Sequence, residues 1–383
     1  MKILFLVSSM QGGGAERVAA LLTNAWSARG HSVTLMPTFS ARGECVYPLA
    51  DSVKLDFLSD RCPPAAGRLT RLRTLRRFIE GLRPDVIVSF LPHVNCTALI
   101  AARGFGIPVI ACERTYPPLM QPRLPLMYSI GRRLTYPFAA ALVGQTQATA
   151  QWLRSFAGSA RVAVIPNPVV NPLPSRTPIK SPLDFVPTDR KLILWAGRLE
   201  PSKRADVLVE ALSQRDCLGT DWHVALLGDG PARRAIQALI DARGLSDRIT
   251  LVGFAGNLGD WYQRADLFVM TTSFEGFPNT LLEALSYGVP SIAFDVLTGP
   301  KELSAGGRRL LLLPDEDHVA TLADSLASLI AAPLRRDELG RAALETNQDY
   351  SEDRILSQWD DLFSAIIGSA SAAKTELRTS RAK

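Results

Sequence analysis

The sequence has few cysteines and no long uninterrupted apolar segment. Its 383 residues include five cysteines, which are scattered and form no C-x-x-C pair. This pattern argues against a disulfide framework and a zinc site, and it favours a reducing compartment. No apolar window is long enough to span a bilayer. The apolar run at the N-terminus is broken by polar residues and glycines 12–14, so it predicts a buried strand and not a signal peptide.

Acidic residues are scarce in the first half of the chain. Residues 1–170 hold 19 Lys/Arg against 8 Asp/Glu, whereas the remainder holds 24 against 29. Aromatic residues make up only 7% of the chain, and no nucleic-acid-binding motif accompanies the basic half. The basic half therefore points to an anionic surface or a phosphate-bearing acceptor, and not to nucleic acid.

The length and the pattern of the chain predict two α/β domains. A chain of 383 residues suits two domains of about 150–200 residues each. In both halves, short apolar runs alternate with helical periodicities, which predicts parallel sheets with helices on both faces. We expect a first domain at 1–170, a linker rich in Pro, Ser and Thr at 171–188, a second domain at 189–350, an amphipathic helix at 351–368 and a flexible tail at 369–383.

The stretch 273–290 (SFEGFPNTLLEALSYGVP) is the most informative part of the sequence. It follows an apolar run and predicts a polar loop followed by a helix that begins near Pro278 and ends near Gly288. Glu275 then lies on the loop and Glu283 on the helix. Both carboxylates can accept hydrogen bonds from the hydroxyls of a sugar or a ribose.

The first turn of that helix contains Asn279 and Thr280. Unpaired backbone N–H groups and the positive end of the helix dipole face the preceding loop there, an arrangement that suits a phosphate. A second loop, after the expected strand 191–196, adds Arg198 and Lys203. Two cations after a strand would lie opposite a bound diphosphate.

These two loops resemble the donor site of glycosyltransferase family 4. The segment Glu-Gly-Phe-Pro-Asn-Thr-Leu-Leu-Glu-Ala is similar to the family's donor motif, and Gly-Arg-Leu followed by Lys203 is similar to its diphosphate loop. Members are retaining enzymes of the GT-B superfamily, found in bacterial polysaccharide and lipid-linked glycan biosynthesis. The resemblance implies two facing Rossmann-like domains, with the acceptor domain first, the nucleotide-sugar domain second and a C-terminal helix that crosses back to the first domain.

The resemblance also implies roles for the donor-site residues. Arg198 and Lys203 would stabilise the leaving diphosphate, and Glu275 would orient the sugar without acting as a nucleophile. Glu283 would bind ribose hydroxyls. Residues 249–254, which include Gly253, would place backbone groups against the nucleobase. Phe277 would belong to the same donor site. We expect no metal and no cofactor, since no metal-ligand constellation is visible in the sequence.

Glycines 12–14 precede the first expected helix. They lack the third glycine of a dinucleotide fingerprint, which argues against NAD. Backbone N–H groups in such a loop can still approach a phosphate, although a simple tight turn is the alternative. The resemblance implies that Gly13 and Gly14 face the donor diphosphate, and that Glu16 and Arg17 face the acceptor.

Further acceptor-side candidates follow two later strands of the first domain. His93 is either a general base or a surface histidine. Glu113 and Arg114 are similar to a Ser-Glu-Arg-type segment of related enzymes that lies near the acceptor. The sequence does not decide whether His93 or Glu113 takes part in catalysis.

The stretch 119–138 mixes arginines with apolar and aromatic residues, as an interfacial segment does. The relevant side chains are Arg123, Arg132 and Arg133 beside Met127, Tyr128, Tyr136 and Phe138. Together with the basic first half, they predict a cytoplasmic protein associated peripherally with the inner leaflet of the cell membrane.

We therefore expect transfer of a hexose or N-acetylhexosamine from a UDP-sugar to a hydroxyl of a glycan, with the anomeric configuration retained. The expected acceptor is a glycan on a polyprenyl diphosphate. A nucleotide-sugar 2-epimerase of the same fold and a non-catalytic paralogue are the alternatives. The sugar, the linkage and the oligomeric state do not follow from the sequence.

Overall fold

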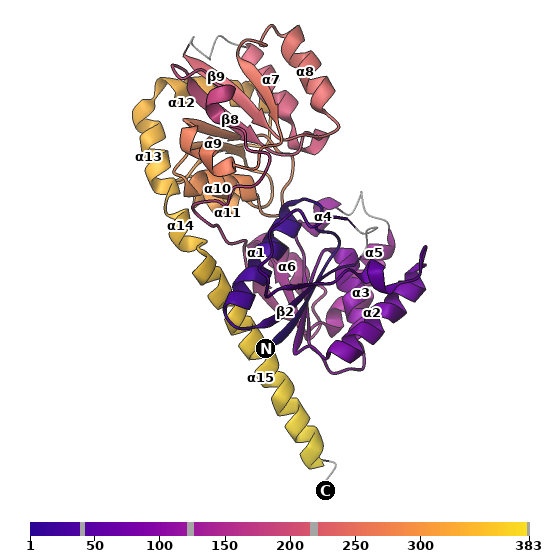
Figure 1. Cartoon of the computed structure of the whole chain (residues 1–383). Helices are drawn as coiled ribbons and strands as arrows, with labels where there is room; N and C mark the ends of the chain where they lie inside the picture. Colours follow the sequence, from indigo (N-terminus) through magenta and orange to yellow (C-terminus); the bar gives the residue numbers. More distant parts are fainter. Residues whose placement is uncertain (39–42, 121–125, 215–220, 381–383) are drawn as a thin grey trace. The chain divides into compact units, whose positions relative to one another are not determined.

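The computed structural model describes residues 1–38, 43–120, 126–214 and 221–380. Arg123 of the expected interfacial segment lies outside the described residues. The chain divides into two compact units, each with its own sheet (Figure 1). Unit 1 comprises Met1–Pro168 and Asp353–Lys383, and unit 2 comprises Val169–Glu352.

Unit 1 contains a parallel sheet that has seven strands within the described residues. In spatial order they are β3 (Lys54–Leu55), β2 (Ser32–Pro37), β1 (Lys2–Val7), β4 (Val86–Phe90), β5 (Val109–Cys112), β6 (Ala141–Gly144) and β7 (Arg161–Val164). The central strands β1, β4, β5 and β6 are almost wholly apolar, because side chains on both faces of the sheet are buried under helices.

Helices cover both faces of this sheet. Its helices are α1 (Gly14–Ala28), α2 (Arg68–Leu82), α3 (Pro92–Ala102), α4 (Pro117–Met120), α5 (Leu126–Thr135), α6 (Gln147–Arg154) and α15 (Glu352–Ser380), with 3-10 turns η1 (Leu58–Arg61) and η2 (Tyr136–Phe138). Helices α1 and α15 share one hydrophobic core with the sheet, and α2, α3 and α6 cover the opposite face, where α5 packs against α3.

Helix α15 joins the first domain, as the sequence predicts. The Trp359 ring lies edge-on to Trp26 of α1, with 5.4 Å between the ring centroids, and Phe363 lies 5.3 Å from the same ring. Arg29, just after α1, also pairs with Asp360 at 2.5 Å. The helix continues to Ser380 and so includes most of the segment expected to be a flexible tail.

Unit 2 contains a second parallel sheet, with six strands within the described residues. In spatial order they are β10 (Ile249–Gly253), β9 (Trp222–Leu227), β8 (Lys191–Ala196), β11 (Leu267–Met270), β12 (Ser291–Phe294) and β13 (Leu311–Leu313). The strand order reverses between β8 and β11, which is where ligands bind in open parallel sheets.

Helices also cover both faces of the second sheet, which confirms the predicted α/β class. They are α7 (Ala205–Gln214), α8 (Arg233–Ala242), α9 (Leu258–Arg264), α10 (Asn279–Ser286), α11 (Pro300–Ser304), α12 (His318–Ala331), α13 (Pro333–Ala343) and α14 (Thr346–Asp349), with 3-10 turns η3 (Pro182–Asp184) and η4 (Pro201–Lys203). Helices α7, α8 and α12 pack on one face, and α9, α10 and α11 pack on the other.

The segment 171–188, expected to be a linker, is part of unit 2 and packs against its helices. Asn171 Nδ2 donates to Ser286 O at 2.7 Å, and the Leu173 N–H donates to the Tyr287 hydroxyl at 2.8 Å. Across the described residues, no helix combines the length and the apolar character needed to cross a bilayer.

Candidate functional site

The loops that follow β8 and β9 in unit 2 cross at two glycines. Gly228 has a φ of +122°, and a Cβ there would lie 1.9 Å from Gly197 O. Gly230 has a φ of +159°, and a Cβ there would lie 2.3 Å from Leu199 O. Only glycine permits this approach, which fixes the backbone of the loop that carries Arg198 and Lys203.

Lys203 and Glu275 form an ion pair at the carboxyl ends of the strands. Lys203 Nζ lies 2.5 Å from Glu275 Oε1, and the two side chains are 26% and 15% exposed. Backbone bonds hold their loops together, since the Ser273 N–H donates to Ser202 O at 2.9 Å. The Thr271 hydroxyl also donates to Lys203 O at 2.8 Å. The structure thus brings together two residues from separate loops, and the sequence analysis had assigned both to one site.

Arg204 braces the loop that leads to Glu275. Its Nε donates to Thr271 O at 2.8 Å, and its Nη2 donates to Thr272 O at 2.9 Å. Arg204 Nη1 lies 2.8 Å from His318 Nε2. The residue has a φ of +49°, in the left-handed region, which directs its side chain across the loop. Sequence reasoning missed this role, because the sequence reveals only a second positive charge next to Lys203 and not the contacts with Thr271 and Thr272.

Helix α10 begins at Asn279, next to the ion pair, as the sequence predicts. Pro278 precedes it, and Phe277 is buried. Asn279 and Thr280 are half-buried in the first turn. The loop is held from the other side because the Thr298 hydroxyl donates to Glu275 O. These contacts fix the start of α10 beside Glu275 and Lys203.

Glu283 lies deeper than the other donor-site candidates. The residue is 2% exposed, and its Oε2 accepts a hydrogen bond from the Tyr262 hydroxyl at 3.1 Å. Tyr262 belongs to α9, and its ring lies 5.7 Å from that of Tyr287. The carboxylate is therefore oriented by a neighbouring helix and not by solvent.

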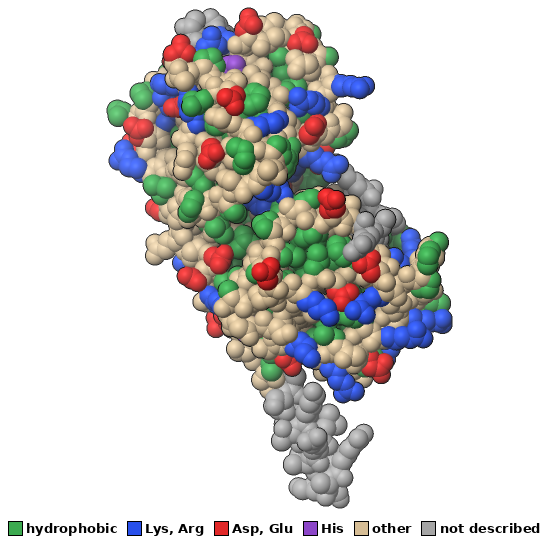
Figure 2. Space-filling view, viewed as in Figure 1, with side chains coloured by type: hydrophobic (Ala, Val, Ile, Leu, Met, Phe, Trp, Pro, Cys, Tyr) green, Lys and Arg blue, Asp and Glu red, His purple; other side chains and the backbone are tan. Residues whose placement is uncertain are grey.

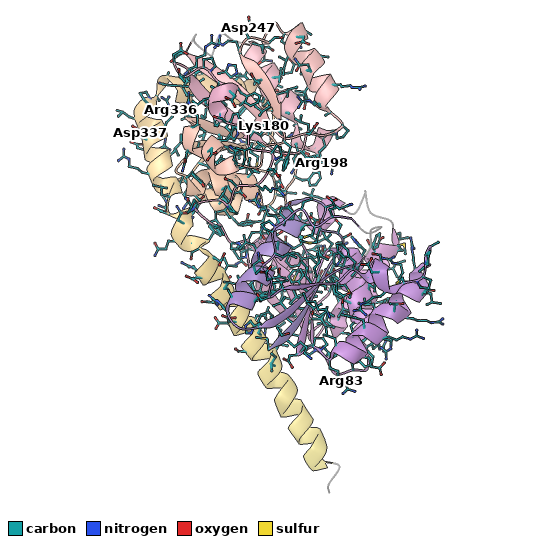
Figure 3. All side chains as sticks on the ribbon, in the orientation of Figure 1. Arg83, Lys180, Arg198, Asp247, Arg336 and Asp337 are labelled. Atoms are coloured by element: carbon teal, nitrogen blue, oxygen red, sulfur yellow. The ribbon has the colours of Figure 1, made fainter. Side chains whose placement is uncertain are left out.

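Arg198 differs from Lys203 in its surroundings. Its side chain is 71% exposed, with Nε 3.8 Å from Glu200 Oε2, and Figure 3 shows it extending away from the ribbon. An exposed contact of this length contributes little to stability, so the guanidinium is available to a ligand.

The end of β10 carries basic groups that sequence reasoning did not identify. Gly253 has a φ of +81°, and a Cβ there would lie 3.2 Å from Lys180 Nζ. Lys180 Nζ donates to Val252 O at 2.5 Å, and Arg233 Nη2 donates to Leu251 O at 3.0 Å. Lys180 lies in the expected linker, where nothing in the sequence places it beside β10.

In unit 1, the glycine loop precedes α1 as expected. The Gly13 N–H donates to the Tyr47 hydroxyl at 3.0 Å, and that hydroxyl donates to Gly13 O at 2.8 Å. Gly14 is the first residue of α1, and Arg17 is the fourth. Glu16 Oε1 accepts from the Ser9 hydroxyl at 3.2 Å, and burial raises the pKa of the Glu16 carboxyl.

Glu113 lies inside unit 1. Its Oε1 accepts hydrogen bonds from Arg132 Nε at 2.7 Å and from the Tyr136 hydroxyl at 2.5 Å. The Glu113 and Arg132 side chains are 0% and 1% exposed. These contacts place Glu113 in the interior, where it holds α5 and η2 against β5.

Arg114 and His93 both lie just after the carboxyl ends of strands in unit 1, Arg114 after β5 and His93 after β4. Arg114 is buried over the Phe90 ring at 4.1 Å, donates to Asn167 Oδ1, and has a pKa lowered to about 10 by burial. His93 is the second residue of α3, and its ring lies 6.1 Å from that of Tyr128. Burial lowers the pKa of His93, so its ring is neutral at pH 7 and can accept a proton.

The expected interfacial side chains are only partly at the surface. Arg132 and Tyr136 are buried, at 1% and 0% exposure, so their predicted contact with a membrane is wrong. One side of α5 faces the core. Arg132 lies on that side, and Tyr136 follows α5 in the turn η2, where it is also buried. Met127 and Phe138 are 51% and 67% exposed.

Among the described residues, no group of three His, Cys, Asp or Glu side chains could hold a metal ion. The sequence contains one Asp-x-Asp pattern, Asp315-Glu316-Asp317. Asp315 Oδ1 lies 2.7 Å from His318 Nε2 and 3.4 Å from Arg204 Nη2.

Two family models match the chain. The model described as "Glycosyl transferases group 1" matches residues 190–332, and the model described as "Glycosyl transferase 4-like domain" matches residues 13–168. The first match contains Lys203, Glu275 and Glu283, and the second contains Gly13, Gly14 and His93.

The chain is also similar to curated relatives and solved structures, among them the following three. It is 27% identical to "Exopolysaccharide phosphotransferase SCO2592" of Streptomyces coelicolor over 96% of this chain, but it spans only 41% of that protein. It is 26% identical, over 96% of this chain and 99% of the relative, to "GalNAc-alpha-(1->4)-GalNAc-alpha-(1->3)-diNAcBac-PP-undecaprenol alpha-1,4-N-acetyl-D-galactosaminyltransferase" of Campylobacter jejuni. Anabaena Alr3699/HepE, in complex with UDP and glucose, has a TM-score of 0.76 at 21% identity, covering 95% of this chain and 100% of that one.

Proposed function

Because the chain belongs to the group 1 glycosyl transferases, glycosyltransferase family 4, whose members transfer a sugar from a nucleotide-sugar, we propose that its donor is a UDP-sugar and its acceptor a lipid-linked glycan. The observation that carries the proposal is the Lys203–Glu275 pair beside the start of α10. A cation and a helix N-terminus at the carboxyl ends of parallel strands form a site for a diphosphate.

The described residues support a division of roles at this site. An ammonium group has three donors, so Lys203 can keep its bond to Glu275 while it donates to phosphate oxygens. The exposed Arg198 adds a second cation to the leaving group. Negative charge that grows on the diphosphate is stabilised by these groups and by the α10 N-terminus.

Glu275 orients the sugar through its hydroxyls, and Glu283, held by Tyr262, binds the ribose. In the transfer step, the bond between the anomeric carbon and the phosphate oxygen breaks as the acceptor oxygen attacks. The acceptor proton passes to the leaving phosphate, and the new bond forms on the same face of the sugar. This route retains the configuration and requires no covalent glycosyl-enzyme and no metal.

The identities of donor and acceptor are supported by the relatives. The Anabaena structure contains UDP and glucose, which favours a uridine nucleotide. The name of the Campylobacter relative specifies a glycan on undecaprenyl diphosphate. Such an acceptor lies in a membrane, and the basic balance of residues 1–170 suits the anionic inner leaflet. We therefore place the protein at the cytoplasmic side of that membrane.

A donor and acceptor panel tests the proposal. The purified chain is incubated with UDP-, GDP- and ADP-sugars, with and without a polyprenyl-diphosphate glycan, and nucleotide release and sugar products are followed. We expect acceptor-dependent release of UDP. Glu275→Gln should abolish most of it, whereas Glu338→Gln, an exposed glutamate on α13, should not. Release from another nucleotide only, or isomerisation of the donor without acceptor, would overturn the assignment.

A further inference from the structure

One side of α5 presents apolar residues to solvent. Leu126, Met127, Ile130 and Leu134 are 73%, 51%, 50% and 66% exposed, and Phe138 in η2 is 67% exposed. Their spacing of three and four residues places the helical members on one side of α5. We call these five residues the α5 face. Isolated exposed apolar residues need no explanation, but a contiguous set of this kind marks an interaction surface.

The opposite side of α5 fixes the helix in this orientation. Arg132 pairs with the buried Glu113, with Arg132 Nε 2.7 Å from Glu113 Oε1. Rotating the helix to hide the α5 face would break a buried ion pair, which is strongly unfavourable. The exposure of the α5 face is therefore built into the packing of unit 1.

A groove continues the apolar surface beyond α5. It has a volume of about 270 Å³ and lies between the end of α3 and the residues Leu134 and Phe138. Its walls include Leu99 and Ile100 of α3, and Ile100 is itself 47% exposed. The α5 face and the groove together form a continuous apolar strip along one flank of unit 1.

Arginines border this strip. Arg68 Nη1 lies 3.8 Å from Met127 Sδ at one end, and the Arg103 guanidinium lies 5.1 Å from the centre of the Phe138 ring at the other. Arg133 is exposed on α5 itself. Figure 2 shows hydrophobic and basic side chains next to one another over α2, α3 and α5.

Acidic residues are missing from this part of the sequence. Glu113 is the only Asp or Glu between Asp85 and Asp184, and it is buried with Arg132. The segment that forms α3, α5 and η2 therefore brings no negative charge to the surface. Apolar residues bordered by arginines, on a segment that adds no surface carboxylate, match a bilayer with anionic headgroups.

We propose that the α5 face inserts into the boundary between the headgroups and the acyl chains of an anionic bilayer, with Arg68, Arg103 and Arg133 at the phosphates. The inference rests on the proposed membrane location, and it names the surface and the mode of binding. Apolar insertion is distinct from attraction of a basic surface alone, because salt does not screen it.

The position of α5 gives this contact a use in the reaction. The Tyr128 ring of α5 packs on His93, which follows β4 at the ligand edge of unit 1. A bilayer at the α5 face would thus lie next to an acceptor-side residue. A lipid-linked acceptor can then reach the ligand edge with its diphosphate still near the headgroups.

Vesicle co-sedimentation of the full chain tests the inference. We expect the wild type to bind vesicles of phosphatidylglycerol and phosphatidylcholine and to keep part of that binding at high salt. Ile130→Glu and Leu134→Glu should each lower the partition coefficient at least about tenfold. The matched control is Leu334→Glu on α13 of unit 2, a leucine that is 76% exposed. Wild-type binding by both α5 variants, with all circular dichroism spectra unchanged, would overturn the proposal.

Tryptophan substitutions give a second measurement that does not depend on a charged variant. Leu134→Trp should add a blue-shifted emission on vesicles that brominated acyl chains quench, whereas Leu334→Trp should show neither change. An unshifted, unquenched Leu134→Trp would contradict insertion. Self-association in solution that Ile130→Glu abolishes would instead identify a second copy as the occupant and refute the proposal. Both assays are independent of sugar transfer, so failure of the proposed activity would leave their result intact.

Discussion

The Lys203 ammonium lies 2.5 Å from Glu275 Oε1, although 72 positions separate the two residues in the sequence. The contact arises because β8 and β11 are neighbours in the sheet, so the loops after them meet at its carboxyl edge. With side chains 26% and 15% exposed, the pair is partly shielded from water yet open to a ligand. In the proposed reaction, the pair would supply both a cation for the diphosphate and an acceptor for a sugar hydroxyl.

Removing either cation should slow turnover far more than it affects folding. Loss of one charge-assisted contact at a developing anion costs about 2–4 kcal/mol, so Lys203→Ala and Arg198→Ala should each lower kcat by roughly 10²–10³. Steady-state UDP release measures the effect. Lys54→Ala and Arg335→Ala, at exposed positions, serve as controls. Near-normal rates in both site variants would remove the diphosphate assignment.

Glu283 should act on donor binding. Contacts with the ribose are present in both the ground state and the transition state, so Glu283→Gln should raise the donor KM and leave kcat nearly unchanged. Glutamine preserves the volume of this buried side chain. Tyr262→Phe, which removes the hydroxyl that orients Glu283, should shift the donor KM in the same direction by less. A fall in kcat alone would exclude the ribose role.

The fold, and the contact between two residues of the candidate donor site, could be predicted because their signals are local. Buried strands such as β1 and β8 are continuous apolar runs, and the start of α10 is marked by Pro278. Glu275 and Lys203 were recognised as one site because each belongs to a motif on its own loop. The family resemblance implied that the C-terminal helix returns to the first domain, and Trp359 of α15 packs there on Trp26.

The remaining features depend on contacts between distant segments, which no local pattern records. Lys180 reaches Val252 only because the segment 171–188 folds onto unit 2. Glu113 looks like an exposed residue after a strand until α5 places Arg132 over it. The same rotation of α5 that buries Arg132 exposes Ile130 and Leu134, so two of the predicted interfacial side chains, Arg132 and Tyr136, are buried instead.

Arg204 should behave as a positioning residue. Arg204→Gly keeps the left-handed backbone conformation but removes the hydrogen bonds to Thr271 O and Thr272 O. Bonds to a charged donor are worth about 1.5–3 kcal/mol each, so the loop before Glu275 should loosen and kcat should fall at least tenfold. Arg204→Lys should recover only part of the activity, because one ammonium cannot reproduce the planar fork. Full activity in Arg204→Gly would show that the brace is dispensable.

Activity should persist in EDTA. In the proposed site, Lys203, Arg198 and the N-terminus of α10 would offer positive charge to the leaving diphosphate, so a divalent ion would not be required for that purpose. Initial rates before and after dialysis against EDTA, with Mg²⁺ or Mn²⁺ added back, measure the dependence. Complete loss of activity that either ion restores would mean that the anion site has been misassigned.

His223 should make stability depend on pH between 7 and 5. Burial first, and then the nearby Arg190 and Arg248, lower the pKa of His223 to about 4, whereas an unfolded histidine titrates near 6.5. Below pH 6.5 the unfolded chain therefore binds a proton that the folded chain does not bind until about pH 4. Stability should fall with pH across this window, and His223 should contribute no change above it.

The ring of His223 is 5% exposed, so we expect a loss of about 1–2 kcal/mol between pH 7 and pH 5 after allowance for screening. Urea denaturation of the wild type and of His223→Gln at pH 7, 6 and 5 measures it. Glutamine is uncharged throughout, so the variant should lose less stability than the wild type as the pH falls. His31→Gln should change the slope by less, because burial also lowers the pKa of His31 but this histidine is only half-buried. Equal slopes for His223→Gln and the wild type would show that His223 is protonated in the folded chain as readily as in the unfolded one.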